Sequence, residues 1–373
     1  MLALSNKTRC RKWNEWHFFP GDVYCGGKLY VTLYPMSKIA KTRASGRVTI
    51  EDVAKRANVS AMTVSRALKN PELVSDELRQ RVDDVVSKLG YVPHHAARTL
   101  ASSKSKLIGV LVPSFSNEVF VAILAGIRDS LQPHGYQLMI GDTQYSRELE
   151  QQLFLTYLEH SLDGFLITGV EHTETTKKRL ATCGTPVVHM MDFSPNYFSV
   201  GFSQQQAGYA MGRHLISRGY RRPAYIGAQL DSRVLKRREG FRRALREANL
   251  ETDYSEIMVP DSSSIELGVK LLDRLLKEAP KTDAVFCCND DLAMGALFEC
   301  QRRGIKVPEQ LAIAGFNDLA PVGWTVPAIT SVTTPRYQVG FEAAQLLLKL
   351  MNNKVPDRTR IDLGFRLAER QST

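Results

Sequence analysis

The 373-residue sequence lacks several features that define common protein classes. It has no run of about 18 apolar residues, so no membrane-spanning helix is predicted. Its basic N-terminus has no apolar core followed by a small-residue cleavage site, which argues against a signal peptide. Neither a nucleophile elbow nor a glycine-rich phosphate loop occurs, so an enzyme is disfavoured. We therefore expect a cytoplasmic protein that has no membrane partner and is not an enzyme.

Cysteine is too scattered along the chain to define a metal site or a disulfide framework. The six cysteines are Cys10, Cys25, Cys183, Cys287, Cys288 and Cys300. Their spacing predicts no set of metal ligands, and no cofactor is expected. Cys287 and Cys288 lie inside an apolar run and are predicted to be core thiols, with a redox pair as the alternative.

The positive charge of the chain is concentrated at one end. Residues 1–106 hold 19 Lys and Arg against 9 Asp and Glu, a net charge of +10, and the remaining 30 basic and 30 acidic residues cancel. Such asymmetry favours a polyanionic partner and predicts that binding weakens steeply with salt. The alternative is an ordinary solvated basic surface.

Residues 48–68, VTIEDVAKRANVSAMTVSRAL, predict two short helices joined by a turn. Thr49 and Asp52 have the spacing of a capping box at the start of the first helix. Asn58 stands where that helix must stop, and asparagine tolerates the left-handed backbone of such a turn. Apolar residues recur at helical spacing along the first helix at Ile50, Val53, Ala54 and Ala57.

The second helix is predicted to present a polar outer face. Ser60 caps it, while Val64 and Leu68 face inward. A helix mounted in this way can lie in the major groove of DNA, with its first turn at the base edges and its arginine at guanine or phosphate. The alternative is an ordinary helical hairpin with solvated polar residues. The outer face carries Ala61, Met62, Thr63, Ser65 and Arg66.

A third helix is predicted after Ser75, and it ends at Gly90. It closes a small all-α DNA-binding head over residues 48–92. Its apolar side consists of Leu78, Val82, Val85, Val86 and Leu89.

Two segments flank this head. Residues 1–47 show no clean period and form a predicted N-terminal extension. We hypothesise that residues 1–35 are disordered or are not part of the natural product, because Met36 would start a basic arm of ordinary length. Residues 93–105 are a predicted hinge helix and linker, too short and too polar to be stable alone. Within them Leu100 is a candidate wedge for a minor-groove base step, and the alternative is a linker leucine packed on its own domain.

From residue 106 to residue 373 short apolar strands alternate with helical segments. The predicted strands are LIGVLVP, YQLMIGD, DGFLITG, TPVVHMMD, YFSVGF, PAYIG, EIMVPD, AVFCCND and LAIAGFND. The alternation predicts an α/β core of two lobes, each with a doubly wound parallel sheet. Ligands of such sheets bind at the carboxyl ends of the strands, so we expect a cleft between the lobes. Polar residues at those ends are Ser114, Asn117, Glu171, His172, Asp192, Asn289, Asp290, Asn317 and Asp318.

The motifs of head and core together resemble the LacI/GalR family of transcriptional repressors. The resemblance extends from about Val48 to about Arg366 and rests on VTIEDVAKRANVSAMTVSRAL, GYVPHHAARTLASSKSKLIGVLVPSFSNEVF, NDDLAMGA and GIKVPEQLAIAGFND. Within the family, SFSNEVFVAILAGI, LDSRVLKRREGF and CNDDLAMGALFECQRRG look most like repressors of gluconate utilisation. The family implies a helix-turn-helix head and a bilobal core like that of periplasmic binding proteins.

The resemblance implies DNA contacts in the head and the hinge. Ala61 and Met62 occupy the positions that contact bases, and Arg66 matches the arginine of the recognition helix. Leu100 and Ala101 match the minor-groove wedge pair. The family also implies a homodimer on pseudo-palindromic double-stranded operator DNA, and the C-terminal RLAERQST is too short to add a tetramerisation helix. The expected DNA-contacting residues are Thr49, Ser60, Ala61, Met62, Thr63, Ser65, Arg66, His94, Arg98, Leu100 and Ala101.

The resemblance also implies an effector site in the cleft. Arg237 matches an effector-contacting arginine, whose guanidinium suits a carboxylate or vicinal hydroxyls. Phe120 matches an apolar wall, and Asn289 matches a hydroxyl-binding position. Asn317 stands where many members have aspartate, and an amide avoids repelling an anionic ligand. Asp290 is interpreted as a helix cap, with an effector contact as the alternative. The expected effector-contacting residues are Ser114, Asn117, Phe120, His172, Arg237, Asn289 and Asn317.

These residues predict a repressor of sugar-acid catabolic genes that is released from its operator by a small-molecule effector, gluconate or a related sugar acid. Effector binding would close or twist the lobes, separate the hinge helices and lower operator affinity. The alternatives within the family are a response to another sugar or a phosphorylated sugar, a ligand that strengthens DNA binding, and activation by a corepressor protein. A periplasmic sugar-binding protein would need a signal peptide and would have no basic head.

Overall fold

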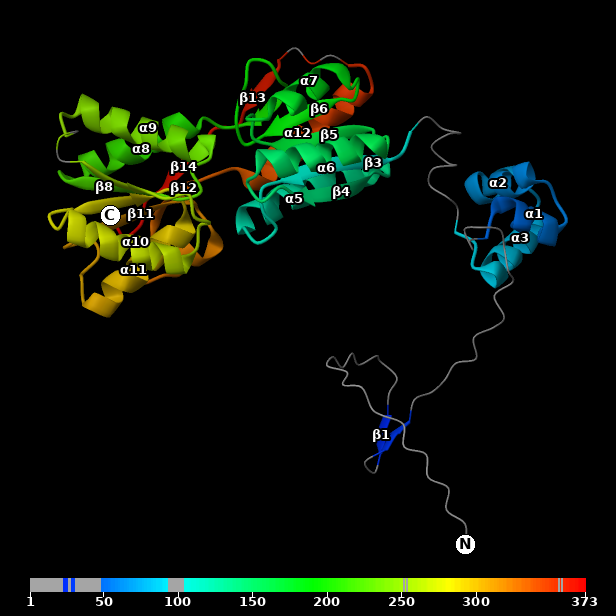
Figure 1. Cartoon of the computed structure of the whole chain (residues 1–373), viewed down its shortest axis with the longest axis horizontal. Helices are drawn as coiled ribbons and strands as arrows, with labels where there is room; N and C mark the ends of the chain where they lie inside the picture. The colour runs from blue at the N-terminus through cyan, green and yellow to red at the C-terminus, as the bar shows by residue number, and fades with distance from the viewer. Residues whose placement is uncertain are drawn as a thin grey trace, which may run out of the picture. The chain divides into compact units, whose positions relative to one another are not determined.

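The chain forms two compact units, Met1–His94 and His95–Thr373 (Figure 1). The predicted hinge contacts His94, Arg98, Leu100 and Ala101 lie outside the residues that the structure describes. No helix in the described part of the chain is long and apolar enough to cross a membrane. The computed structural model describes residues 23–25, 28–30, 48–92, 104–250, 252, 254–354, 356 and 358–373.

The head consists of short helices whose ends follow the sequence signals. Thr49 and Asp52 form the predicted capping box, in which the Thr49 amide donates to the Asp52 carboxylate at 2.9 Å. Asn58 has φ 53° and ψ 50°, the left-handed conformation that ends the first helix. Ser75 caps the third helix and Gly90 ends it with φ 61°, as predicted. The elements are α1 (Ile50–Ala57), α2 (Ala61–Lys69), the 3-10 turn η1 (Pro71–Leu73) and α3 (Asp76–Leu89).

A small hydrophobic core holds these helices together. Val53 of α1, Val64 of α2 and Val82 of α3 are fully buried in it. The inward orientation predicted for Val64 is therefore confirmed. Ala67 and Tyr91 are also buried here, although the sequence pattern did not single them out.

Within residues 1–47 the structure describes the backbone of two short antiparallel strands, β1 (Val23–Cys25) and β2 (Lys28–Tyr30). The sequence shows no clean period here, and these two strands were not predicted. Valine and tyrosine favour extended backbone, and the sequence between the strands, Gly26 and Gly27, has the composition of a tight hairpin turn. Strands of three residues are too short to show an alternating pattern, so the periodicity did not indicate them.

The first lobe of the core is built on a six-stranded parallel sheet with the order β13-β7-β6-β5-β3-β4. Its strands are β3 (Leu107–Val112), β4 (Gln137–Asp142), β5 (Gly164–Thr168), β6 (Val187–Met190), β7 (Ser199–Gly201) and β13 (Arg360–Asp362). Its helical elements are α5 (Glu118–Leu131), η2 (Gln132–His134), α6 (Arg147–Glu159), α7 (Glu174–Thr182) and α12 (Arg336–Met351).

The second lobe has a six-stranded sheet with the order β14-β12-β11-β10-β8-β9. Its strands are β8 (Pro223–Gly227), β9 (Ser255–Met258), β10 (Ala284–Cys287), β11 (Ala312–Asn317), β12 (Thr330–Thr333) and β14 (Arg366–Ala368). Its helical elements are α8 (Gln204–Ser217), α9 (Ser232–Glu247), α10 (Ile265–Glu278), α11 (Asp290–Arg303) and η4 (Ala320–Gly323).

The predicted architecture of two doubly wound sheets is confirmed, with one correction to the strand directions. β14 runs antiparallel to β12, pairing Ser331 with Ala368 and Thr333 with Arg366. β12, β13 and β14 were not predicted as strands from the sequence. Each has only three or four residues, several of them polar, so none forms an apolar run.

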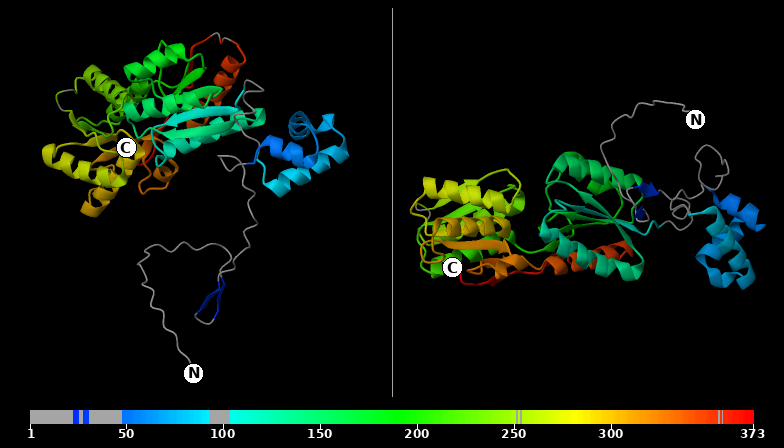
Figure 2. Two further views of the ribbon diagram at one scale, coloured as in Figure 1. Left: turned by 45° about the vertical axis from the view of Figure 1, so that its right-hand side comes forward. Right: turned by 90° about the horizontal axis from the view of Figure 1, so that it is seen from below.

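The chain passes between the lobes at residues 202–203, 334–335 and 363–365 (Figure 2). α8 follows a strand of the first sheet but packs against α9 of the second lobe, and α12 follows β12 but packs against α5 of the first lobe. Buried apolar residues of both lobes belong to one continuous cluster. Each lobe therefore contains segments from both halves of the core sequence. If one lobe moves relative to the other, the backbone of these three connections must change conformation.

The thiols of Cys287 and Cys288 are completely buried at the end of β10, which confirms that they are core thiols. Burial raises the pKa of the Cys288 thiol to about 11. The thiol is therefore protonated and unreactive at neutral pH.

Glycines allow α5 and α12 to approach each other closely. A Cβ placed on Gly340 of α12 would collide with the carbonyl oxygen of Ile123 in α5, and one on Gly126 of α5 would collide with the carbonyl oxygen of Tyr337 in α12. Backbone atoms cannot move aside as a flexible side chain can. The contact between these helices therefore requires glycine on both sides.

We expect the substitution Gly340→Ala to lower the free energy of unfolding by about 2 kcal/mol, because the added methyl group must push two packed helices apart. Urea unfolding followed by circular dichroism measures the change. Gly323→Ala is the matched control, since its Cβ would lie 3.8 Å from the nearest atom of Arg370, an ordinary contact. Equal effects of the two substitutions would contradict this account of the helix contact.

Candidate DNA interface and effector site

The outer face of α2 carries two long side chains that project into solvent. Met62 is 70% exposed, and Arg66, one turn later, is also exposed. The Arg66 guanidinium lies 3.9 Å from the Met62 sulfur, so the two form one continuous surface. Ala61 is half-buried against the core of the head. This face has the size and the chemistry to contact base edges and phosphates.

Hydroxyl groups of residues predicted to contact DNA form hydrogen bonds at the helix starts of the head. The Ser60 hydroxyl accepts from the Thr63 amide at 3.1 Å and lies 2.8 Å from the Thr63 hydroxyl. The Thr49 hydroxyl donates to Asp52 at 2.7 Å. These bonds fix the starts of α1 and α2, while Ser65 is half-buried on the outer face. Their DNA contacts, like those of Met62 and Arg66, stay predictions.

A cavity lies between the two lobes at the carboxyl ends of the strands. The first lobe contributes the segments after β3, β4 and β5, and the second lobe contributes the segment after β8. This is the edge at which the sequence predicted a ligand. We call it the cleft cavity; its lining residues are Pro113, Thr143, Tyr145, Ser146, Arg147, Glu150, Thr168, Gly169, Val170, Glu171, Asp231, Ser232 and Arg233.

Backbone strain is concentrated at this edge of the sheets. Pairs of consecutive non-glycine residues with positive φ follow β4 and β8 and end β11. Such conformations cost free energy and persist where the surrounding structure enforces them, often at functional sites. The pairs are Gln144 and Tyr145 (49° and 58°), Gln229 and Leu230 (64° and 46°), and Asn317 and Asp318 (109° and 56°).

Two helices begin at the cleft cavity, one from each lobe. α6 has Ser146 as its N-cap and Arg147 as its first residue. α9 has Asp231 as its N-cap, and Ser232 and Arg233 form its first turn. Helix N-termini carry partial positive charge, which favours an anionic ligand nearby. At α9 the Asp231 carboxylate already accepts from the amides of Arg233 and Val234, so the start of α6 is the freer of the two.

The arginines at these helix starts are paired with carboxylates. Arg233 is buried and contacts Asp231 at 2.6 Å. Burial alone would raise the pKa of Asp231, but the charge of Arg233 and its hydrogen bond outweigh burial and lower that pKa. Arg147 contacts Glu171 at 2.5 Å, and both side chains are about half exposed. The buried pair is thus fixed, whereas the outer pair can exchange partners.

Hydroxyl groups surround these charges. They belong to Thr143, Tyr145, Ser146, Thr168 and Ser232. The Thr168 hydroxyl is buried and has no hydrogen-bond partner among the described residues. A buried polar atom without a partner is rare and calls for an occupant that can bond to it.

Arg237 lies one turn beyond Arg233 on α9, outside the lining of the cleft cavity. Its Nε donates to Gln204 at 2.8 Å, and its Nη1 donates to the Cys288 carbonyl at 2.7 Å. Its guanidinium carbon lies 3.7 Å from the centre of the Phe316 ring. Burial lowers the pKa of Arg237, and Nη2 has no partner among the described residues. The side chain is therefore held rigidly, with one donor edge left over.

Asn289 takes the cap role that was predicted for Asp290, and its contact with an effector stays a prediction. Asn289 is the N-cap of α11, since its side chain accepts from the Leu292 amide at 3.1 Å. It also bonds to the Ser263 hydroxyl at 2.6 Å. Asp290 is therefore not the cap. It is fully buried and binds the amide of Leu319 and the hydroxyl of Ser331, both at 2.7 Å, which ties α11 to the end of β11 and to β12.

The other predicted effector residues do not line the cleft cavity, and their effector contacts stay predictions. Asn117 caps α5 and donates to the Tyr145 hydroxyl at 3.4 Å. His172 contacts Glu150 at 2.6 Å. Ser114 bonds to Ser116 at the start of the same loop, and Phe120 is buried in the core. Asn317 is buried, and its Oδ1 has no partner among the described residues.

The side chains that line the cleft cavity were largely missed from the sequence. Arg147, Ser232 and Arg233 lie in the first turns of α6 and α9, directly after the cap residues Ser146 and Asp231. The patterns YSREL and LDSRV, a cap-type residue directly after a predicted strand, were the available signal. That signal marks a helix start, and the pairing of the two starts across the cleft is visible only in three dimensions.

Comparison with known proteins bears on both parts of the chain. Residues 49–94 match the model of the bacterial regulatory proteins of the lacI family, and residues 213–373 match that of the periplasmic binding protein-like domain. The HTH-type transcriptional regulator GntR of Pseudomonas aeruginosa is 48% identical over 334 residues, which cover 89% of this chain and 97% of that protein. The chain belongs to the LacI family. It is a DNA-binding transcriptional regulator and not an enzyme.

Solved structures of LacI-family proteins have the same fold. The transcription regulator GntR from Chromobacterium violaceum is 48% identical, with a TM-score of 0.69 over 71% of this chain and 98% of that one. A LacI-family regulator from Silicibacter pomeroyi is 32% identical, with a TM-score of 0.81 over 87% of this chain and 99% of that one. These matches support the helix-turn-helix head and the bilobal core.

An ion pair joins the two lobes of this LacI-family core next to the cleft cavity. Asp192, which follows β6 in the first lobe, is 3% exposed. Lys236 of α9 in the second lobe contacts both of its carboxylate oxygens, at 2.6 and 2.7 Å. Ser232 adds a hydroxyl at 3.3 Å. The pair links the two lobes of the core.

We expect Lys236→Met to lower the free energy of unfolding by about 1–2 kcal/mol. The change leaves the buried Asp192 carboxylate without its cation, and the half-exposed lysine keeps the loss below that of a fully buried pair. Urea unfolding measures it. Lys270→Met, which removes an exposed pair with Glu266 on α10, is the control and should change stability little. Equal changes would argue against the ion pair between the lobes.

Proposed function

We propose that this LacI-family regulator is a cytoplasmic homodimer that represses genes of sugar-acid catabolism and leaves its operator when a sugar acid binds the cleft cavity. In this proposal residues 48–92 bind the operator, residues 93–105 form the hinge and residues 106–373 form the sensor. Gluconate or a related compound is the proposed effector. The convergence of two helix N-termini, two arginines and several hydroxyls in one cavity carries the proposal.

The lining of the cleft cavity matches the two ends of a sugar acid. A polyhydroxy chain needs many hydrogen-bonding partners, and hydroxyls from both lobes supply them, among them the unpartnered hydroxyl of Thr168. A carboxylate needs positive charge, which the start of α6 provides together with Arg147. A neutral hexose would use the hydroxyls but not the charges.

The carboxylate end is best served by Arg147. Its present partner Glu171 is half exposed, so replacing that carboxylate by the carboxylate of a ligand conserves the charge pairing. Arg233 is already satisfied by Asp231 in a buried pair, which an anionic ligand would have to disrupt. Arg237, with its remaining donor edge, is proposed to orient the ligand from deeper in the second lobe.

Exposed apolar side chains support the dimer. Trp324 is 88% exposed and Val326 is 80% exposed in the single chain, and both follow η4. Large apolar groups that gather on a surface mark contact sites for another protein. A second copy of the chain would cover them, and two heads would then be available for the half-sites of a pseudo-palindromic operator.

We expect gluconate to bind the protein saturably and neutral hexoses to bind at least tenfold more weakly. Arg147→Gln should weaken gluconate binding by tenfold or more, since it removes hydrogen bonds to a charged group, and should leave hexose binding unchanged. Isothermal titration calorimetry with gluconate, its 6-phosphate, ketogluconates and glucose measures these affinities.

The matched control is Arg128→Gln, which removes an arginine of similar exposure paired with Asp129 on α5. Arg237→Ala tests the deeper position in the same titrations, after circular dichroism has established that the variant is folded. If neutral hexoses bind best and neither cleft arginine matters, the sugar-acid effector is wrong. Tightest binding of the 6-phosphate would identify a phosphorylated sugar instead.

We expect Leu100→Ala to weaken binding to the specific operator while effector affinity stays unchanged, because the proposed wedge acts only on DNA. Fluorescence anisotropy with an inverted-repeat promoter fragment and with random duplex, with and without gluconate, provides the measurement. Equal loss of DNA and effector binding would argue against the hinge assignment. No preference for any inverted repeat over random duplex would contradict the repressor function itself.

A further inference from the structure

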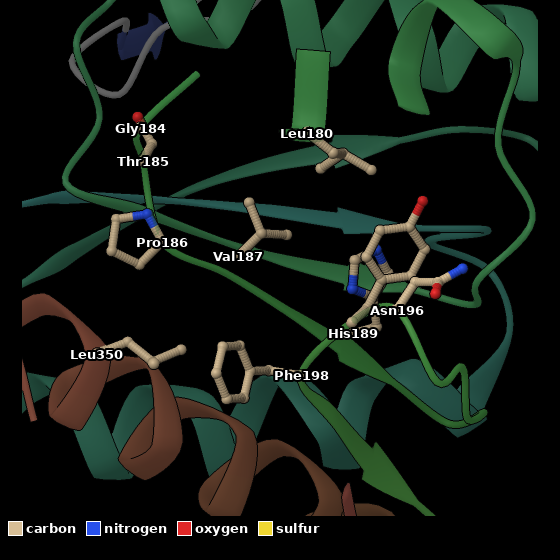
Figure 3. A pocket seen from close by; sticks show the side chains of 10 residues that line it. Leu180, Gly184, Thr185, Pro186, Val187, His189, Asn196, Phe198 and Leu350 are labelled. Atoms are coloured by element: carbon tan, nitrogen blue, oxygen red, sulfur yellow. The ribbon is translucent and has the colours of Figure 1, made fainter. Parts of the chain in front are cut away.

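A second cavity lies in the first lobe and shares no lining residue with the cleft cavity (Figure 3). It measures about 300 Å³, within the range of small-molecule sites. Its polar end is formed by His189, Asn196 and Tyr197. None of its described lining residues carries a full charge. The apolar walls come from α7, β6 and α12 and their neighbours: Leu180, Pro186, Val187, Phe198 and Leu350.

His189 at the polar end is completely buried and only partly bonded. Its Nε2 lies 3.0 Å from Nε2 of His172, but its Nδ1 has no hydrogen-bond partner among the described residues. Burial and the neighbouring His172 lower the pKa of His189 to about 3, so the ring is neutral. A buried ring nitrogen without a partner is costly, and it points to an occupant of the cavity.

The hydrogen bonds of His172 determine whether Nδ1 of His189 is a donor or an acceptor. Nδ1 of His172 lies 2.6 Å from the Glu150 carboxylate, which can only accept, so that nitrogen carries the proton. In a neutral His172 the other nitrogen, Nε2, then accepts a hydrogen bond from Nε2 of His189. Nδ1 of His189 is left with a lone pair and can only accept.

The ring of His189 is also held in orientation. Tyr197 stacks on it with a centroid distance of 4.3 Å, and His172 fixes its other nitrogen. The acceptor therefore has a defined position at the end of an otherwise apolar cavity. Rigid placement of one polar group in an apolar site gives directional recognition at small entropic cost.

We propose that this cavity is a second ligand site, which takes a small uncharged molecule with an apolar body and one O–H or N–H donor that bonds to Nδ1 of His189. The absence of charged groups among its described lining residues separates this ligand from the anionic effector proposed for the cleft.

The second cavity lies next to parts of the chain that are proposed for effector binding and for the hinge. Glu150 lines the cleft cavity, so the hydrogen-bonded chain from Glu150 through His172 to His189 connects the two cavities. A neighbouring hollow shares Gly184, Thr185, Pro186 and Leu350 with the second cavity. It is also lined by Lys104, which lies in the hinge segment 93–105.

Phenol and toluene are the probes, because they differ only in the hydrogen-bond donor. We expect phenol to bind saturably to the full-length protein at pH 8 and at least fivefold more tightly than toluene. Long-range proton–nitrogen NMR should show Nδ1 of His189 unprotonated in the free protein, and its nitrogen shift should move on addition of phenol. The pH keeps imidazoles of ordinary basicity neutral.

His189→Phe keeps a ring on Tyr197 but removes the acceptor, and it should abolish the preference for phenol. His160→Phe, on an exposed histidine at the end of α6, is the matched control and should leave the preference intact. Leu180→Trp fills the cavity from α7 and should abolish binding of both probes. It provides an independent test if His189→Phe does not fold.

Four results would overturn the proposal. They are an absence of saturable phenol binding, equal affinity for the two probes, a proton on Nδ1 of His189 in the free protein, and unchanged phenol binding in the Leu180→Trp variant. None of these depends on the effector, so failure of the sugar-acid proposal and failure of this one are distinguishable.

Discussion

The parallel arrangement of strands is the constraint on which the regulator's sensor depends. Parallel strands end at the same edge of a sheet, so every loop that follows a strand and every helix start that follows a loop gathers there. In this core the rule places the starts of α6 and α9 at one cavity, although some eighty residues separate them in sequence. It also gathers the strained pairs at Gln144, Gln229 and Asn317 at that edge. The topology of the sheets therefore determines where the cleft lies, and the side chains determine what it can bind.

Charge pairing determines which of these groups can respond to a ligand. Arg233 and Asp231 satisfy each other in a buried site, where an unpaired charge would be strongly destabilising. Arg237 is held by Gln204, by a backbone carbonyl and by the Phe316 ring, so it acts as a rigid support between helices and sheet. Of these three arginines, only Arg147 has an ion pair, with Glu171, in which both side chains are about half exposed. A ligand can exchange for the Glu171 carboxylate there without leaving a buried charge behind.

The sequence predicted the elements of this fold better than it predicted the lining of the site. Capping residues such as Thr49, Asn58 and Ser75 act locally, and each does what its position indicated. β12 and β14 were missed because short polar strands are stabilised by their neighbours in the sheet and not by their own pattern.

The predicted effector residues show a related limit of sequence reasoning. Asn289 ends a strand as expected, but its side chain caps α11 and pairs with Ser263. A cap and a ligand contact require the same residue types at the same positions. Residue type alone cannot separate these two roles. The cleft lining includes the first turns of α6 and α9, whose meeting across the lobes depends on long-range packing.

A chain of hydrogen bonds in the first lobe runs from Glu150 through His172 to His189. It connects the proposed effector site in the cleft with the second cavity. Because each bond in the chain needs one donor and one acceptor, the direction of all its bonds follows from the state of Glu150. The Glu150 carboxylate can only accept, so His172 donates to it and accepts from His189, which leaves Nδ1 of His189 as an acceptor. A cleft ligand that drew Glu150 away from His172 would therefore remove the bond that orients the two rings toward the second cavity. Linkage makes this coupling reciprocal, so an occupant that bonds to His189 would in turn favour the arrangement in which Glu150 accepts from His172.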